Sequence, residues 1–155
     1  MIACLGIASF VGAAEPELKI ISGGSTQSIT RAELGRKLQA AQITVYSPVY
    51  QRQMTYEGFW LDEIFRALHA SLGDQDISFE CADHYGTSMP AGDVGEKKWL
   101  VAYGELPGLT WTPLPERHAL TLPGPWYVVG RDPSSYNDFP WPYQVISIQV
   151  SGSEF

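Results

Sequence analysis

Residues 56–81, YEGFWLDEIFRALHASLGDQDISFEC, set a helical pattern directly before a strand pattern. Over residues 61–72 the apolar side chains recur every three or four positions, which predicts an amphipathic helix that ends at Gly73. Over residues 76–81 apolar and polar side chains alternate, which predicts a strand with one buried face. The domain therefore needs a core that both kinds of element share.

A second helix is predicted at residues 30–39. Thr30 and Glu33 match the Ser/Thr-x-x-Glu capping box, in which two side chains satisfy free backbone amides at a helix start. Residues 47–55 are expected to be irregular. Segments with strand composition predict further strands at residues 17–21, 42–46, 100–103, 119–122, 126–130 and 143–150. Strands separated by two main helices predict an α+β fold.

The last of these strands, residues 143–150, has two unlike faces. Ile146, Ile148 and Val150 form a wholly apolar face, whereas the face that begins with Val145 is mostly polar. The apolar face is therefore expected to be the buried one.

The composition fits one ordinary domain, which we place at residues 18–151. The chain has 155 residues, of which 45 % are hydrophobic and 17 % are charged. Its formal net charge of −7 repels phosphate backbones and anionic lipid. Nucleic acid and membrane surfaces are therefore not expected as partners.

The N-terminal segment 1–14, MIACLGIASFVGAA, resembles a signal peptide that is cleaved after Ala14, because it is uncharged and ends in small residues. It is too short to span a bilayer, and no membrane insertion is expected after cleavage. The protein is therefore expected to be periplasmic or secreted. The alternatives are a buried first strand or helix, an uncleaved anchor and a lipid-modified Cys4. Cleavage would leave Cys81 without a partner for a disulfide.

Several strong catalytic and cofactor motifs are missing from the sequence. It contains no Gly-rich phosphate loop, no strand–GxGxxG–helix unit, no paired-cysteine zinc motif, no Cys-x-x-Cys-His and no Gly-x-Ser-x-Gly. The histidines are His69, His84 and His118, and three are too few to favour a multi-histidine metal site. No residue is assigned a catalytic role.

The densest chemistry lies in residues 81–89, CADHYGTSM. Cys81, His84 and Met89 have a spacing that resembles the thiolate, imidazole and thioether ligands of blue-copper proteins. Such a site needs a second histidine from an earlier strand, and His69 falls on the predicted helix instead. The simpler interpretation is that Cys81 and Met89 face the core and that an aspartate at position 83 braces the turn.

The order of short motifs along the chain resembles the pterin-binding domain of the sulfite-oxidase family of molybdenum enzymes. The matching segments are SIT at 28–30 with EL at 33–34, YEGFWL at 56–61, ISFECADHYGTSMP at 77–90, LVAY at 100–103 and PGPWYVV at 123–129. The phrases F-x-C-A-D-x-Y and WPYQV also resemble small exported relatives of that family. The resemblance implies a sulfite-oxidase-like molybdopterin-binding-domain fold, with a mixed β-sheet and two main helices, and an oxidoreductase cofactor.

One departure from the family pattern changes what this resemblance implies. The family's metal-ligating cysteine lies about a dozen residues before the glycine of its W-x-G-like motif. The corresponding residues 45–50, VYSPVY, contain no cysteine, and Cys81 falls on a later strand that does not ligate metal in the family. The expectation is a cofactor-free descendant of the fold. The alternatives are a molybdopterin-dependent oxidoreductase with an unusual ligand set, such as a Tyr46 or Ser47 oxygen, and the copper electron carrier.

The fold implied by the resemblance would bring polar and aromatic residues from two segments to one end of the sheet. The candidate ligand-binding residues are Tyr46, Tyr50, Arg52, Tyr56, Cys81, His84 and Tyr85. The expected ligand is a small molecule, and the expected partner is a periplasmic redox or sensor protein. For the aromatic residues, filling of the core is the other interpretation.

A long aromatic loop at residues 130–143, GRDPSSYNDFPWPY, is the candidate docking surface for that partner. Long loops of this kind are often functional, and exposed Trp and Tyr favour contact with partners. The candidate docking residues are Tyr136, Phe139 and Trp141. The other interpretation is a loop that packs over the sheet.

Overall fold

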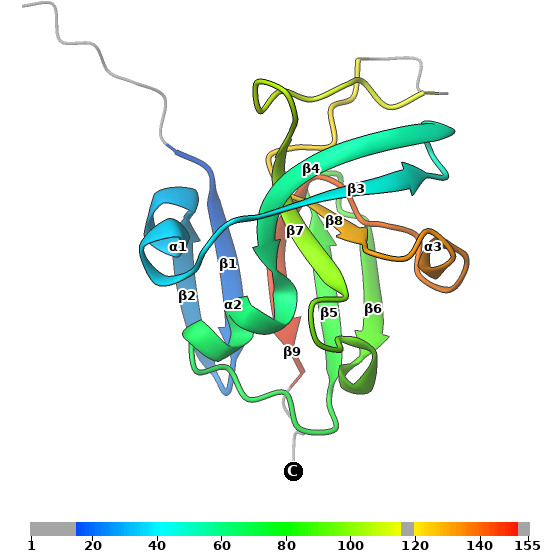
Figure 1. Ribbon diagram of the computed structural model, residues 1–155. Coiled ribbons are helices and arrows are strands. Elements are labelled where there is room, and N and C mark those ends of the chain that lie inside the picture. The colour runs from blue at the N-terminus through cyan, green and yellow to red at the C-terminus, as the bar shows by residue number, and fades with distance from the viewer. Residues whose placement is uncertain (1–14, 116–119, 152–155) are drawn as a thin grey trace, which may run out of the picture.

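The computed structural model describes residues 15–115 and 120–151, where the chain forms two β-sheets with short helices beside them (Figure 1). The larger sheet has the strand order β2-β1-β9-β5-β6. Its strands are β1 (Glu17–Ser22), β2 (Ser25–Thr30), β5 (Asp76–Cys81), β6 (Gly86–Pro90) and β9 (Val145–Val150). β1 and β9 are parallel and the other neighbours are antiparallel, so this sheet is mixed.

The smaller sheet is antiparallel and has the strand order β3-β4-β7-β8. Its strands are β3 (Ala41–Ser47), β4 (Arg52–Trp60), β7 (Trp99–Glu105) and β8 (Tyr127–Gly130). Together with the helices, the two sheets confirm the α+β class. The predicted signal peptide at residues 1–14 lies outside the described residues.

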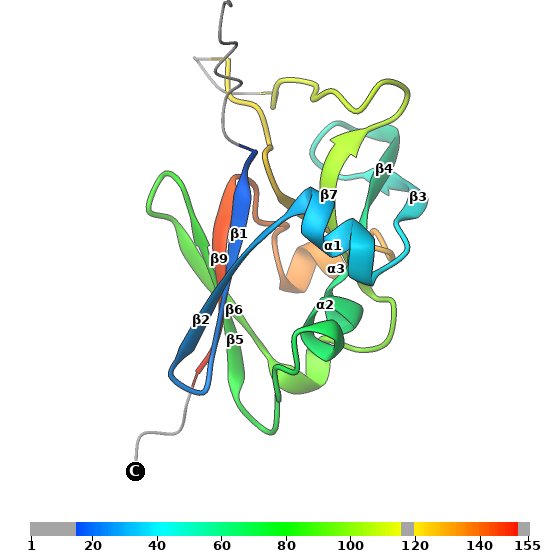
Figure 2. The ribbon, with the colours of Figure 1, turned by 90° about the vertical axis from the view of Figure 1, so that its left-hand side faces the viewer.

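The helices and the smaller sheet lie on the same side of the larger sheet, whose other face is open to solvent (Figure 2). The helices are α1 (Arg31–Lys37), α2 (Leu61–Ala67) and α3 (Ser135–Asp138), with a 3₁₀ turn at Ala91–Asp93. Among the described residues, none of these helices has the length and apolarity needed to cross a membrane.

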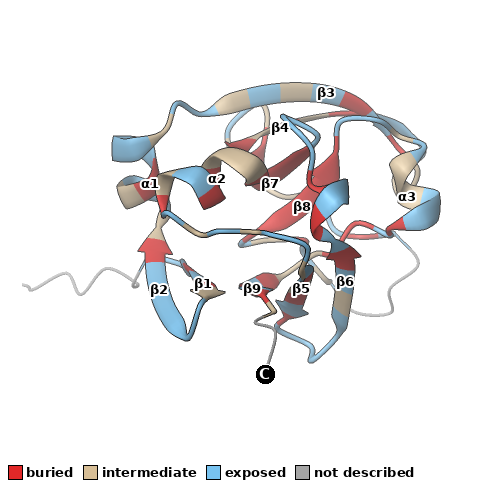
Figure 3. Cartoon of the chain, turned by 90° about the horizontal axis from the view of Figure 1, so that it is seen from below, coloured by how far each residue is buried: buried red, intermediate tan, exposed pale blue. Residues whose placement is uncertain are grey.

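The core lies between the two layers, where the inward faces of the strands meet α2 (Figure 3). The larger sheet contributes alternate residues, such as Leu18, Ile77 and Phe79, and α2 contributes Ile64 and Phe65. Each such side chain stabilises the fold by about 1.5–3 kcal/mol through its removal from water. The predicted alternation of β5 is confirmed, because Ile77, Phe79 and Cys81 are all buried.

The start of α1 confirms the predicted Thr30 cap, although the Glu33 carboxylate contacts the Thr30 hydroxyl instead of the Thr30 backbone amide of a full capping box. The backbone N–H of Glu33 donates to Oγ1 of Thr30 at 3.2 Å, and the Thr30 hydroxyl donates to Oε1 of Glu33 at 3.2 Å. The helix buries Leu34 and ends at Lys37, two residues before the predicted end.

The helix predicted at residues 61–72 was expected to end at Gly73, and this is wrong because α2 ends at Ala67. The N–H of Ala70 donates to the carbonyl of Phe65 at 2.9 Å, and that of His69 donates to the carbonyl of Arg66 at 3.2 Å. These two bonds form a Schellman motif, with His69 in the left-handed conformation at φ 54°. A histidine therefore holds the position where a glycine was expected.

The predicted faces of β9 are also partly wrong. Ile146 is 38 % exposed, whereas Val145 is fully buried. A register shift between Glu80 and Cys81 sets Val145 opposite Cys81 and moves it to the core side.

Three other segments differ from expectation. Residues 52–55 belong to β4 instead of an irregular segment. The described part of the expected strand at 119–122 is not a strand, and β6 was not predicted.

Candidate functional site

A cavity of about 490 Å³ lies where the β3–β4 turn, the β5–β6 turn and the loop around α3 come together. Five aromatic side chains line it, namely Tyr85, Tyr127, Tyr136, Trp141 and Tyr143. Val49 comes from the β3–β4 turn, and Asp83 from the β5–β6 turn. We call this site the aromatic cavity.

The loop around α3 forms one wall through a small network of contacts. The Nε1–H of Trp141 donates to Oγ of Ser135 at 3.2 Å, and the rings of Trp141 and Tyr136 pack edge to face at 5.7 Å. Oδ1 of Asp132 accepts from the Ser134 backbone and hydroxyl, and these bonds hold the pKa of that carboxyl below its usual value. The wall therefore has a defined local structure.

The β5–β6 turn positions a second wall. Oδ1 of Asp83 accepts from the backbone N–H of Tyr85 at 3.0 Å, which confirms that Asp83 braces the turn. The backbone N–H of His84 donates to the carbonyl of Cys81 at 3.0 Å, and His84 has a left-handed φ of 67°. His84 is exposed and does not line the cavity, whereas Tyr85, which is 50 % exposed, does.

Tyr127 connects the aromatic cavity to a group of buried tyrosines. Its ring packs edge to face against Tyr56 at 5.7 Å, and the hydroxyl of Tyr50 donates to the carbonyl of Thr112 at 2.7 Å. Burial raises the pKa of Tyr50, Tyr56 and Tyr127, so all three phenols stay protonated near neutral pH. The Tyr127 hydroxyl is buried and has no hydrogen-bond partner among the described residues.

The residues expected from sequence in one pocket are only partly brought together. Tyr85 lines the aromatic cavity. Tyr50 and Tyr56 do not line it: Tyr56 packs against the cavity residue Tyr127, and Tyr50 donates to the carbonyl of Thr112. Tyr46 is 44 % exposed on β3 and does not line the cavity.

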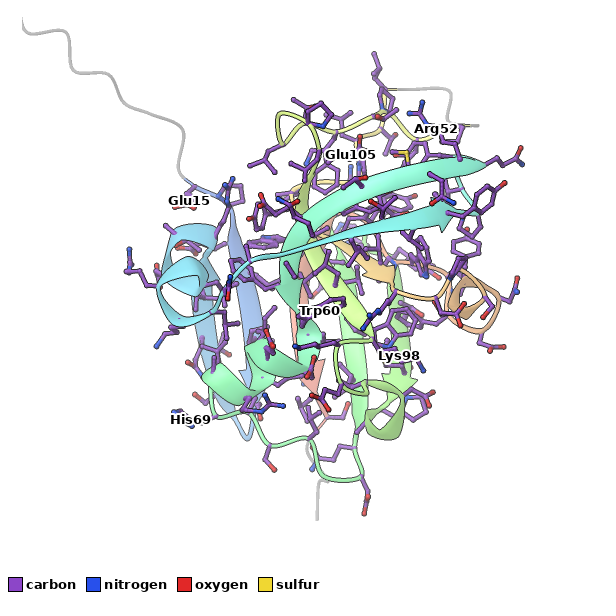
Figure 4. The ribbon with its side chains drawn as sticks, in the orientation of Figure 1. Glu15, Arg52, Trp60, His69, Lys98 and Glu105 are labelled. Atoms are coloured by element: carbon purple, nitrogen blue, oxygen red, sulfur yellow. The ribbon has the colours of Figure 1, made fainter. Side chains whose placement is uncertain are left out.

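Arg52 lies in a different hollow, at the same end of the molecule as Glu105 (Figure 4). Glu105 is only 7 % exposed and accepts from Thr112 twice, from N–H at 2.9 Å and from the hydroxyl at 2.7 Å. This hollow and the aromatic cavity share no lining residue, so they are separate sites.

The expected exposure of the docking residues is wrong for two of the three. Phe139 is 6 % exposed, and its ring packs against Phe79 at 5.4 Å and Trp99 at 5.2 Å. Trp141 is 3 % exposed and belongs to the cavity wall. Tyr136 is half-buried and lines the same cavity.

The three residues considered as copper ligands do not converge. Met89 is paired with Ile77 across β5 and β6, four residues from Cys81 and about 13 Å away along the strand. His69 lies beside α2, away from the turn where β5 ends (Figure 4). Among the described residues, no group of three or more His, Cys, Asp or Glu side chains could hold a metal ion.

Cys81 is a buried thiol outside the aromatic cavity. It is 1 % exposed, and burial, with smaller contributions from Asp83 and Glu80, raises its pKa to about 11. A buried thiol of this kind behaves as a small apolar side chain.

We expect Cys81 to react slowly with a thiol reagent in the folded protein. A pKa of about 11 leaves about one thiolate in a thousand at pH 8. The rate in buffer should therefore be at least about a hundredfold below the rate in denaturant, where the thiol is exposed and its pKa is ordinary. Equal rates in the two conditions would contradict the burial.

The raised pKa of Cys81 also makes the stability of the fold depend on pH. Because folding raises this pKa above 9.0, its contribution to stability is complete below pH 9 and is lost as pH rises through 11.

The sequence signals for the aromatic cavity were spread over three segments. The motif at 81–89 supplied Tyr85, and the loop at 130–143 supplied Tyr136 and Trp141. The sequence predicts Asp83 only as a turn residue, and Tyr127 lies in a strand whose pattern is that of a buried core. Comparison of the chain with models of protein families gives no match, and comparison with curated proteins gives none either.

Proposed function

We propose that this chain is an exported binding domain that holds a small organic ligand in the aromatic cavity. The observation that carries the proposal is the cavity itself, with about 490 Å³ of space and five aromatic side chains in its walls. Sites for small molecules are commonly of this size, largely apolar and provided with a few polar groups. The carboxylate of Asp83 is such a group.

The proposed scaffold is a sulfite-oxidase-like domain without its cofactor. A mixed sheet beside helices agrees with this fold, and the short motifs support it. A molybdopterin needs a soft metal ligand and basic side chains for its phosphate. The described lining of the aromatic cavity contains no Cys, Lys, Arg or His, and Cys81 is buried elsewhere, so these residues do not fit that cofactor.

Export rests on the signal-like residues 1–14. A periplasmic redox or sensor protein remains the proposed partner. Tyr85, which is 50 % exposed on the cavity wall, is the aromatic residue best placed to contact such a partner.

A thermal-shift screen tests the ligand site directly. We expect at least one compound of a broad metabolite panel to raise the midpoint of unfolding by about 2–8 °C, the shift expected for a ligand near saturation. Val49→Trp, which fills the cavity from the β3–β4 turn, should remove this shift. Ile146→Trp adds the same side chain on the solvent face of β9 and should retain it.

The same preparation separates the proposal from its alternatives. A panel without any hit, together with an empty pulldown from a periplasmic fraction, would contradict a binding function. A shift that survives in Val49→Trp would place the ligand elsewhere. Molybdenum or copper near one atom per chain by elemental analysis would favour the oxidoreductase or the electron carrier.

A further inference from the structure

The described lining of the aromatic cavity carries negative charge and no positive charge. Asp83 is the only charged side chain in its described lining, and no ion pair within residues 15–115 and 120–151 involves it. The backbone N–H of Tyr85 occupies Oδ1, so the carboxylate keeps acceptor capacity for a ligand. The formal net charge of the whole chain, −7, has the same sign as Asp83.

The aromatic walls favour the same sign of ligand. The faces of Trp and Tyr rings are electrostatically negative and attract ammonium and guanidinium groups, with Trp the strongest. Trp141 and four tyrosines line the cavity. An anion would meet the Asp83 carboxylate without a basic residue of the described lining to offset it.

We propose that the ligand of this cavity is an organic cation, an ammonium or guanidinium group on an apolar body, held by aromatic faces and by the Asp83 carboxylate. This inference rests on the proposed function and names the chemical class of its ligand. The size of the cavity, about 490 Å³, leaves room for an apolar body beside the cationic group.

A matched set of three probes tests the charge preference. Benzyltrimethylammonium is the cation, neopentylbenzene is its neutral carbon isostere, and phenylacetate is an anion of similar size. We expect the cation to bind the full chain about tenfold tighter than the isostere, and phenylacetate to bind weakest. Titration followed by NMR reports both affinity and the upfield shift of the N-methyl protons over the rings.

Two variants locate the effect. Asp83→Asn retains the acceptor for the Tyr85 N–H, so it should fold normally and bind the cation about tenfold more weakly without a change for the isostere. Asp74→Asn, an exposed carboxylate before the other end of β5, removes the same charge and should bind like the wild type. Trp141→Leu should also weaken the cation more than the isostere.

The outcomes separate this inference from the proposed function. If panel compounds bind but the cation binds no tighter than its isostere, or Asp83→Asn has no effect on it, the inference is overturned and the ligand site remains. If neither the probes nor any panel compound binds, both fail. A cation preference that disappears in Asp83→Asn and persists in Asp74→Asn supports the inference.

Discussion

Replacing Gly58 with alanine is expected to lower the free energy of unfolding by about 3 kcal/mol or more. A Cβ atom at this position would overlap the carbonyl oxygen of Val101 and lie 2.6 Å from Cα of Ala102. Both atoms belong to the backbone of β7, which passes close to β4 at a register shift between Glu57 and Gly58. Backbone atoms in the middle of a sheet cannot move aside cheaply, so the clash must distort the ladder.

Gly35→Ala is the matched control for this prediction. Gly35 lies inside α1, and a Cβ atom there has no neighbour within 4 Å. The substitution should stabilise the protein by about 0.5–1 kcal/mol, because alanine favours the helix and restricts the unfolded chain. Urea unfolding of both variants measures the two effects. A Gly58→Ala variant within 1 kcal/mol of the wild type would contradict the close approach of β4 and β7.

The sequence predicted elements well where the signal was local. β5 has the predicted bounds, 76–81, because alternation of apolar and polar residues reports one buried face directly. The start of α1 at Thr30 was also predicted, since a capping box involves only residues three apart.

The sequence failed where distant contacts decide the backbone. Gly73 is a good local signal for a helix end, but the carbonyl of Leu68 accepts from Nε2 of Gln27 at 3.1 Å, and Leu68 itself is buried. These tertiary contacts accompany a helix that ends at Ala67, five residues before the predicted end at residue 72, with His69 in the left-handed position. The face of β9 likewise depends on a register shift opposite Cys81.

The aromatic cavity shows the same limit. Its walls come from Val49, from Asp83 and Tyr85, from residues 114–115, and from the segment 127–143, which are far apart in the sequence. Composition marked the loop at 130–143 and the motif at 81–89 as unusual, but only the packing of the turns brings them together. The fold implied by the resemblance predicts that Tyr46 joins them, but β3 places Tyr46 on an exposed face instead.

Phe139→Ala is expected to lower the free energy of unfolding by about 3–4 kcal/mol. The side chain is buried between Phe79 of β5 and Trp99 of β7, so it joins the larger sheet to the smaller one. Truncation removes an aromatic ring from this core and leaves a cavity that the sheets cannot close. A docking residue would behave in the opposite way, because its removal would weaken a partner and leave stability unchanged.

Tyr85→Ala is the control, since Tyr85 is 50 % exposed at the aromatic cavity. This substitution should lower the free energy of unfolding by less than about 1 kcal/mol. Urea unfolding of the two variants distinguishes a core residue from a surface one. If Phe139→Ala unfolds at the same urea concentration as the wild type, Phe139 is not part of the core. That result would support Phe139 as a docking residue. A large loss would mean that Phe139 anchors the loop whose next residues, Pro140 and Trp141, form the cavity wall. Core packing and the ligand site would then depend on the same side chain.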